Sequence, residues 1–285
     1  MATAFVQSKL TRQTGSSTTV AVTFTSNVTA GNLIRVMASW DGGFGVLSGI
    51  ADNLGNTYTI TDNLSDGGNP NHYALWYAKN ITGGACTVTV TFTSPRPITL
   101  LHVEEISGAD TTAPLDQHSL NLQATPGTGA NGVVSTSVTT TTDGQFVSGC
   151  SMATGSSTIN YTGGTAVGLT TTVRDNVGTS VSDRAVIAQS GVQATQGTTQ
   201  VRATSDNNQP VVTGIMTFKA AANTPNITSV STATPREGAS LTITGTSFGA
   251  SHTYTLSGAT FGADAMPTIA SGALTVASSN VGTYT

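Results

Sequence analysis

The chain alternates between apolar and polar side chains over many short stretches, and this period of two predicts β-strands. In residues 18–26, Val20 and Phe24 share one face with the alternate valine between them, while threonine and alanine take the other face. Residues 86–94 repeat the pattern, with Cys86 on the side of the apolar residues. Each stretch is therefore expected to be a half-buried strand with its apolar face toward a core.

The same signature recurs along most of the chain. Further strands are predicted over residues 32–40, 72–80, 97–107, 145–153 and 209–219. Clusters of Gly, Asn, Asp and Pro separate these stretches and favour tight turns. Residues 182–192 fit either a short helix or a strand, and their surroundings favour a strand. The spacing predicts an all-β protein in which two antiparallel sheets pack face to face.

A break in the pattern predicts a domain boundary. Residues 219–225 hold a run of three alanines and end on a proline, which interrupts the succession of strands. We expect a large antiparallel β-sandwich, jelly-roll-like, over residues 1–221 and a small immunoglobulin-like β-sandwich over residues 222–285.

The second segment begins with a recognisable arrangement of apolar, Pro and Gly residues. The positions concerned are Pro225, Ile227, Pro235, Gly238, Leu241, Ile243, Gly245, Phe248 and Gly249. They resemble the start of IPT/TIG domains, which are immunoglobulin-like modules of cell-surface, enzyme-appended and phage structural proteins. The resemblance implies a hairpin of residues 227–231 and 240–245. Domains of that family run longer, so the module is expected to be abbreviated or incomplete, with residues 281–285 as its last strand.

The first segment also resembles a known unit. The stretches that carry the resemblance are residues 27–40, 51–59, 77–92, 104–116 and 214–219. They resemble a β-sandwich domain of bacteriophage virion and bacterial extracellular proteins, which immunoglobulin-like modules often follow. The resemblance implies a surface or scaffold role and brings no catalytic motif with it.

Charge and hydropathy exclude several classes of protein. Only 8% of the residues are charged, the net charge is −4, and the ten Lys and Arg are scattered from Lys9 to Arg236. Nucleic acid is therefore not an expected partner. A stretch of about 18 apolar residues, as a membrane helix requires, does not occur in the sequence. Residues 1–10 do not resemble a secretory signal, so neither a membrane protein nor an exported chain is expected.

The residues that usually carry catalysis do not form a recognisable motif. Glu104 and Glu105 are neighbours on a predicted strand and should point to opposite faces, so they cannot act as a facing acid and base. The string G-x-S-x-G occurs once, at residues 245–249, where it falls in a predicted turn after a strand and not at the strand-to-helix elbow of a hydrolase. The four histidines lack metal-ligand spacing; they are His72, His102, His118 and His252. We expect no enzyme activity and no cofactor.

Cys86 and Cys150 are the only cysteines of the chain. A domain of this size does not need a disulfide to fold, and cysteine is among the residues most often buried. They are expected to be free, buried thiols.

Two weak candidates for binding sites remain. Asp62, Asp66 and Asn69 lie close together in a predicted loop, and calcium prefers such clustered oxygen ligands. The EF-hand spacing is missing, however, and turns in which Asp or Asn side chains bond the backbone explain the same composition.

Aromatic residues form the second candidate. Trp40, Tyr73, Trp76 and Tyr77 could stack on a sugar ring, because aromatic faces cover apolar surface well. Their positions on predicted strands favour packing inside the sandwich over glycan binding.

Taken together, these features favour a non-enzymatic structural protein of a bacteriophage virion, such as a capsid decoration or head-fibre subunit assembled in the host cytoplasm. Its partners would be the major capsid protein or other virion proteins, and docking on a symmetric shell favours a homo-oligomer, with a trimer preferred. The alternatives are a tail-fibre or baseplate component, a bacterial surface adhesin or carbohydrate-binding module outside the cell, and an accessory part of an enzyme.

Overall fold

The computed structural model consists almost entirely of β-strands. It describes residues 2–66, 71–154, 158–178, 184–222, 226–230, 241–246 and 281–284. The chain separates into two compact units, Met1–Ala221 and Ala222–Thr285. A short 3-10 turn, η1 (Phe44–Val46), interrupts the strands of the first unit. The predicted all-β sandwich fold is confirmed.

The first half of the larger unit is a sandwich of two antiparallel sheets. Its strands are β1 (Ala4–Gln13), β2 (Ser17–Thr23), β3 (Leu33–Asp41), β4 (Leu47–Asp52), β5 (Thr59–Ser65), β6 (Asn71–Ala78), β7 (Thr87–Arg96) and β8 (Thr99–Ser107). Five strands form a sheet of order β1-β8-β3-β6-β5, and three form a sheet of order β2-β7-β4. Apart from β5, which lies at the edge of the larger sheet, this is the strand order of a jelly roll.

The second half of the unit repeats this arrangement. Its strands are β9 (Leu115–Gln123), β10 (Gly129–Val134), β11 (Val138–Thr139), β12 (Gln145–Thr154), β13 (Tyr161–Gly163), β14 (Thr172–Val177), β15 (Arg184–Gln193), β16 (Thr198–Thr199), β17 (Arg202–Ser205) and β18 (Val211–Phe218). The five-stranded sheet has the order β14-β15-β12-β18-β9, and a three-stranded sheet has the order β10-β17-β13. Strands β11 and β16 form an additional pair.

The two halves have the same topology, and their residues correspond at a nearly constant spacing. Val20 pairs with Val90 in the first half, and Val133 pairs with Ala203 in the second. Residue 133 follows residue 20 by 113 positions, and residue 203 follows residue 90 by the same 113. The larger unit is therefore an internal duplication of one sandwich, which the sequence analysis did not predict.

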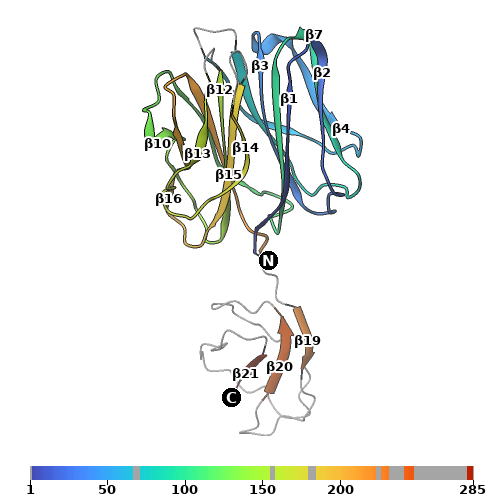
Figure 1. Cartoon of the computed structure of the whole chain (residues 1–285). Coiled ribbons are helices and arrows are strands. Elements are labelled where there is room, and N and C mark those ends of the chain that lie inside the picture. Colours follow the sequence, from blue (N-terminus) through green and yellow to red (C-terminus); the bar gives the residue numbers. More distant parts are fainter. Residues whose placement is uncertain are drawn as a thin grey trace. The chain divides into compact units, whose positions relative to one another are not determined.

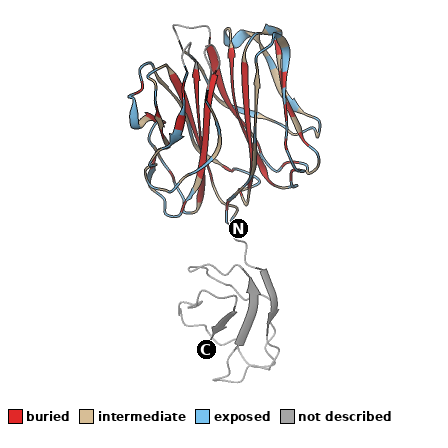
Figure 2. Cartoon of the chain, viewed as in Figure 1, coloured by how far each residue is buried: buried red, intermediate tan, exposed pale blue. Residues whose placement is uncertain are grey.

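The duplicated sandwiches stack into four layers of sheet (Figure 1). One core lies between the β2-β7-β4 sheet and the first five-stranded sheet, and it contains Val90 and Trp76. A central core lies between the two five-stranded sheets and contains Met37 and Met216. Smaller cores lie between the second five-stranded sheet and the outer strands of the second half, which are β10, β17 and β13 with the pair β11 and β16. The central strands are consequently the most buried part of the unit (Figure 2).

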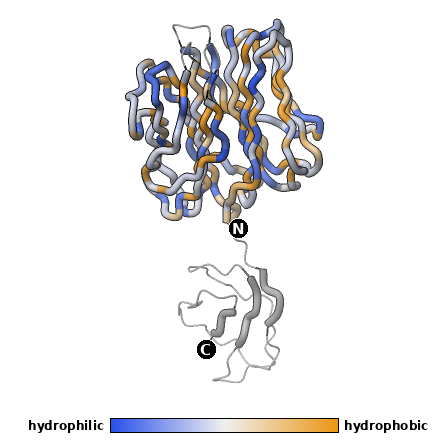
Figure 3. Tube along the Cα trace, viewed as in Figure 1, coloured by the Kyte–Doolittle hydropathy of each residue, from blue (hydrophilic) through white to orange (hydrophobic). Residues whose placement is uncertain are grey.

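The alternating pattern of the sequence explains these layers (Figure 3). Val20, Val22 and Phe24 are buried, and Cys86 lies with them in the same core, as predicted. The ambiguous residues 182–192 contain the first nine residues of strand β15, which confirms the strand interpretation. The central strands of both five-stranded sheets, such as β3 and β18, are buried on two faces, and they are correspondingly rich in apolar residues.

The smaller unit contains three described strands. These are β19 (Asn226–Val230), β20 (Leu241–Thr246) and β21 (Val281–Tyr284). They form an antiparallel sheet of order β19-β20-β21. The expected pairing of residues 227–231 with 240–245 agrees with the β19–β20 ladder, and the expected last strand agrees with β21.

Candidate functional site: a polar network between the two sandwiches

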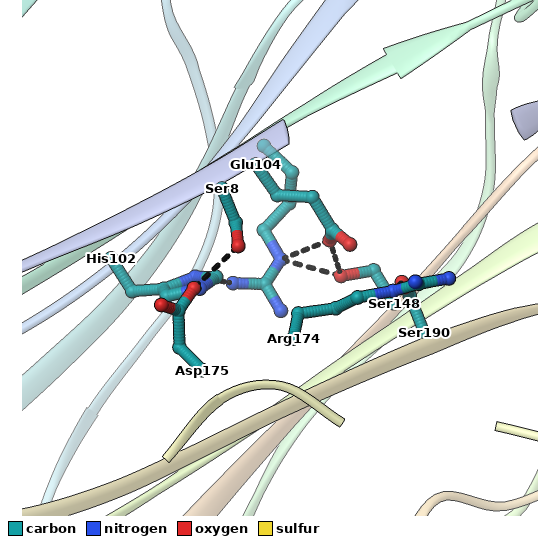
Figure 4. A network of polar contacts seen from close by, with 8 residues as sticks. Ser8, His102, Glu104, Ser148, Arg174, Asp175 and Ser190 are labelled. Atoms are coloured by element: carbon teal, nitrogen blue, oxygen red, sulfur yellow. Dashed lines mark hydrogen bonds and ion pairs between the residues drawn. The ribbon is translucent and has the colours of Figure 1, made fainter. Parts of the chain in front are cut away.

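The main cluster of ionisable side chains lies between the two five-stranded sheets (Figure 4). Its members come from both sandwiches: Ser8 of β1, Arg35 of β3, His102 and Glu104 of β8, Ser148 of β12, Arg174 and Asp175 of β14, and Ser190 of β15. We call this cluster the interface network. It places polar chemistry inside a region that is otherwise filled by the central core.

Arg35 stands at the centre of the interface network. Its Nε donates to Ser148 Oγ at 2.9 Å, and its Nη1 lies 3.0 Å from His102 Nδ1. Glu104 lies beside it with an Nε–Oε2 distance of 3.9 Å and also accepts a hydrogen bond from the Ser148 hydroxyl. Arg35 is 1% exposed and Glu104 is 1% exposed. The buried positive charge thus has a buried negative partner, which such a site requires.

The tautomer of His102 follows from its neighbours. Arginine can only donate, so His102 Nδ1 must be an acceptor and Nε2 must carry the proton. Nε2 then donates to Asp175 Oδ2 at 3.0 Å. Burial lowers the pKa of His102, and the positive charge of Arg35 also lowers it, against the opposing effect of the bond to Asp175. His102 is therefore a neutral link between Arg35 and Asp175.

Equivalent strands meet across the interface, as they do across a two-fold axis. Ser8 of β1 donates to Asp175 of β14, and His118 of β9 pairs with Asp62 of β5 at 2.6 Å. Asp175 follows Asp62 by 113 positions, and β9 is the second-half equivalent of β1. Each sandwich thus offers a first-strand side chain to the same aspartate of the other. This reciprocity is characteristic of isologous contacts.

A second polar contact is also formed between equivalent positions. Arg184 donates to Asn71 Oδ1 at 2.5 Å, and these residues are again 113 positions apart. The same guanidinium donates to Ser39 Oγ at 2.9 Å and pairs with Asp41. Arg35 and Ser148 are equivalent in the same sense. Three sets of cross-sandwich bonds therefore fix the relative position of the two halves.

The side chains of the interface network are not arranged to activate a nucleophile. In a catalytic triad the imidazole faces the serine hydroxyl, whereas here Asp175 stands between Ser8 and His102. The hydroxyl of Ser148 faces Glu104 and Arg35, both of which are enclosed by the two sheets. The chemistry that this geometry supports is the specific joining of two apolar surfaces.

The predicted calcium ligands have other partners. Asp62 accepts the hydrogen bond from His118, and Asp66 pairs with Asn71 through its side chain at 3.1 Å. Asn69 lies outside the described residues. Within the described part of the chain, a cluster of three or more His, Cys, Asp or Glu residues with metal-binding geometry does not occur.

The predicted sugar-stacking aromatics are packed inside the protein. Trp40 is 0% exposed, Tyr73 is 1% exposed and Trp76 is 3% exposed, so these three rings cannot form a platform for a ligand. Trp40 instead packs against Trp76, with ring centres 6.4 Å apart. Tyr77 is half-buried and packs against Phe218. The burial that sheet stacking produces decides between the two interpretations of the sequence.

Other sequence predictions can be placed directly. Glu104 points toward the interface network, while Glu105 accepts from Asn32 Nδ2 at 2.6 Å on the opposite face, as expected for strand neighbours. Cys86 and Cys150 are free and buried, as predicted. Burial raises the pKa of Cys150 to about 11.

The three described histidines, His72, His102 and His118, occupy separate environments. His72 is stacked on Trp40, with ring centres 5.4 Å apart. His102 and His118 bond aspartates at the interface, and His252 lies outside the described residues.

Arg35, Ser148 and Arg174 were not singled out in the sequence analysis. The signal was present for Arg35, which is a lone charge within an apolar strand, but its partners lie on strands far away in the sequence.

Comparison of the chain with models of protein families, with curated proteins and with solved structures finds no match in any of the three. Among the described residues, a helix long and apolar enough to cross a membrane is not found.

Proposed function

We propose that this chain is a non-enzymatic structural protein of a bacteriophage virion, a capsid decoration or head-fibre subunit. Its larger unit docks on the shell, and its smaller, immunoglobulin-like unit serves as an accessory module. The observation that carries the proposal is the tandem jelly roll, because jelly rolls are a recurrent architecture of viral capsid domains. Lectin domains also use this fold, so the proposal does not rest on fold alone.

The interface network supports a structural role. Arg35 and Glu104 of the first sandwich bond Ser148 of the second, and His102 of the first bonds Asp175 of the second. Charged groups held in this way specify one arrangement of the two halves. A rigid block of four sheets is suited to a part that must keep its shape on a particle.

The outer sheets supply places for attachment. Strands β4 and β13 are the last strands of the two three-stranded sheets and occupy equivalent positions in the duplication. An edge strand can pair with a strand of another chain, which both covers the edge and forms a joint. Such pairing, repeated around a symmetric shell, favours a homo-oligomer, and we expect a trimer.

The proposal is tested by locating the chain on particles. An antibody raised against the purified protein is applied to phage particles and to cells from the same culture, and gold-labelled complexes are imaged by electron microscopy. Label at symmetric positions on the head is the expected result. Label confined to the cell envelope would overturn the proposal in favour of an adhesin.

Reconstitution gives an independent test. Purified chain is added to capsids from phage in which its gene is deleted, and bound protein is measured after sedimentation, with the oligomeric state determined by light scattering. We expect saturable binding by a trimer. A monomer that does not bind these capsids would contradict the proposal.

A further inference from the structure

The second sandwich has an open hollow on its outer sheet, lined by small polar residues, that the proposed function does not use. Its volume is about 400 Å³. The hollow is lined by Thr128, Gly129, Asn160, Thr162, Thr204, Ser205 and Asp206. This volume lies within the range of small-molecule sites, roughly 300–1,000 Å³. The lining residues carry hydroxyl groups, one amide and one carboxylate, and most of the surface that they expose in the hollow is apolar carbon.

The rim of the hollow is held by hydrogen bonds between two of these residues, Asn160 and Asp206. Asn160 donates to the Asp206 carboxylate through its backbone N at 2.8 Å and through its Nδ2 at 2.7 Å. The backbone N of Asp206 in turn donates to the Asn160 carbonyl at 3.3 Å. Each carboxylate oxygen receives one bond and keeps further capacity to accept. The acceptors are therefore held in place before any ligand arrives.

The duplication provides an internal comparison for this hollow. The positions 113 residues earlier than Asn160, Ser205 and Asp206 are Leu47, Phe92 and Thr93. In the first sandwich Phe92, the counterpart of Ser205, is 3% exposed and packs in the core with its ring centre 5.7 Å from that of Trp40. Ser205 has too little volume to do the same. The two halves have equivalent strands here, but Leu47 and Phe92 of the first are replaced by Asn160 and Ser205 in the second.

The residue types of the lining indicate which class of ligand the hollow fits. Lys and Arg do not occur in it, and the Asp206 carboxylate would repel an anion. A single carboxylate is too few for a calcium ion, which takes six to eight oxygen ligands. Hydroxyls both donate and accept, and a carboxylate accepts, which together match the alcohol groups of a neutral polyol.

We propose that this hollow binds a neutral saccharide, with Asp206 and Asn160 orienting ring hydroxyls and Thr162 supplying a further hydrogen bond. The proposal does not depend on the virion role, since a sugar site on the outer sheet is compatible with either a particle or a cell-surface protein. It also uses none of the buried aromatic residues.

The test is saturation-transfer NMR on the full chain. The probes are methyl glycosides of glucose, galactose, mannose, rhamnose and N-acetylglucosamine, with maltose and lactose, and with sialic acid as the anionic comparison. We expect at least one neutral sugar to give a saturable signal. We expect Asp206→Asn to weaken it by roughly tenfold, as for the loss of one bond to a charged group.

Two further variants separate binding from folding. Thr162 is exposed, and its side chain has no hydrogen bond within the described part of the fold, so Thr162→Val should weaken binding without changing the melting temperature. The matched control is Thr91→Val, because Thr91 precedes Thr204 by 113 positions and lies on the outer sheet of the first sandwich. This control should bind as the unchanged chain does. Absence of binding by all neutral sugars, stronger binding of sialic acid, or binding unaffected by both hollow variants would each overturn the proposal.

Discussion

Arg35 is the central residue of the interface network. Replacing it with methionine would leave Glu104 as a buried charge without its cation, and Ser148 and His102 would each lose a donor. Breaking a buried pair in this way costs about 3–5 kcal/mol. We therefore expect Arg35→Met to lower the free energy of unfolding by this amount in urea titrations followed by tryptophan fluorescence.

A second substitution separates the effect of the uncompensated charge from the loss of the arginine side chain, which both variants share. In Arg35→Met combined with Glu104→Gln the uncompensated charge is absent, so part of the stability should return. If the single variant lost less than about 1 kcal/mol, the network would not be the joint described above.

His102 gives the network a predictable response to acid. Burial lowers the pKa of His102 below its ordinary value of 6.5, so the unfolded chain takes up a proton near pH 6.5 that the folded chain does not. Stability should therefore decrease as the pH falls below about 6.5. The pKa of Asp175 is also lowered, through its bonds to His102 and Ser8, but its contribution is lost only below its ordinary value of 3.8.

The contributions of His102 and Asp175 to stability can be separated by measuring the melting temperature as a function of pH. Between about pH 6.5 and 5, His102→Gln should show a shallower decrease than the unchanged chain, although it is less stable at pH 7. His72→Gln is a comparison at another buried histidine, whose pKa is lowered by burial. Equal slopes for His102→Gln and the unchanged chain would refute this assignment.

The interface network could be predicted from the sequence only in part. The alternation rule placed Glu104 and Glu105 on opposite faces, and their contacts agree with it. The rule cannot show which strand a side chain faces, and the partners of Arg35 lie 67 and 113 residues away. Pairing at such distances depends on how whole sheets stack, which local periodicity does not determine.

At the level of single elements, paired glycines record the duplication in backbone conformation. Gly55 has a φ of 77° and Gly168 a φ of 79°, and they occupy equivalent turns. Any L-residue is strained there, by about 1–2 kcal/mol. Their surroundings differ, because a Cβ at Gly55 would meet nothing within 4 Å, whereas one at Gly168 would lie 2.4 Å from the Thr198 carbonyl oxygen.

This difference gives a matched pair of substitutions. Gly55→Ala should cost about 1–2 kcal/mol, and Gly168→Ala should cost clearly more, since it adds a clash with backbone to the same strain. Chemical denaturation of both variants measures the difference. An equal loss at both sites would show that the turn of Gly168 relaxes at no cost.

Strands were predictable, but their duplication was not. Alternating valines and threonines identify strands such as β2 and β7 directly. The repeat preserves burial and backbone angle more than residue type, so Trp40 corresponds to Ala153 and Phe92 to Ser205. Asp62 and Asp175, each beside a bulge in its ladder, are among the few identical pairs. So few identities over 113 residues do not stand out in a chain rich in Thr, Gly and Val.

At the scale of the larger unit, the central core makes the two sandwiches mutually dependent. Met37 of the first and Met216 of the second are both 0% exposed in this core, and either sandwich alone would expose it to water. Exposing so much apolar surface on both sides is unfavourable. The two halves are therefore expected to unfold together rather than one after the other.

Val88 and Val201 allow this expectation to be tested, because they are 113 positions apart, identical, and buried in the outer cores at opposite ends of the stack. Val→Ala at either site removes about 2 kcal/mol. In hydrogen exchange of the full chain, each variant should reduce the protection of the slowest amides in both β7 and β17 by the same amount, since these amides exchange only when the unit unfolds globally. If Val88→Ala affected β7 and left β17 unchanged, the sandwiches would unfold separately, and the interface network would hold together two independent domains instead of completing one.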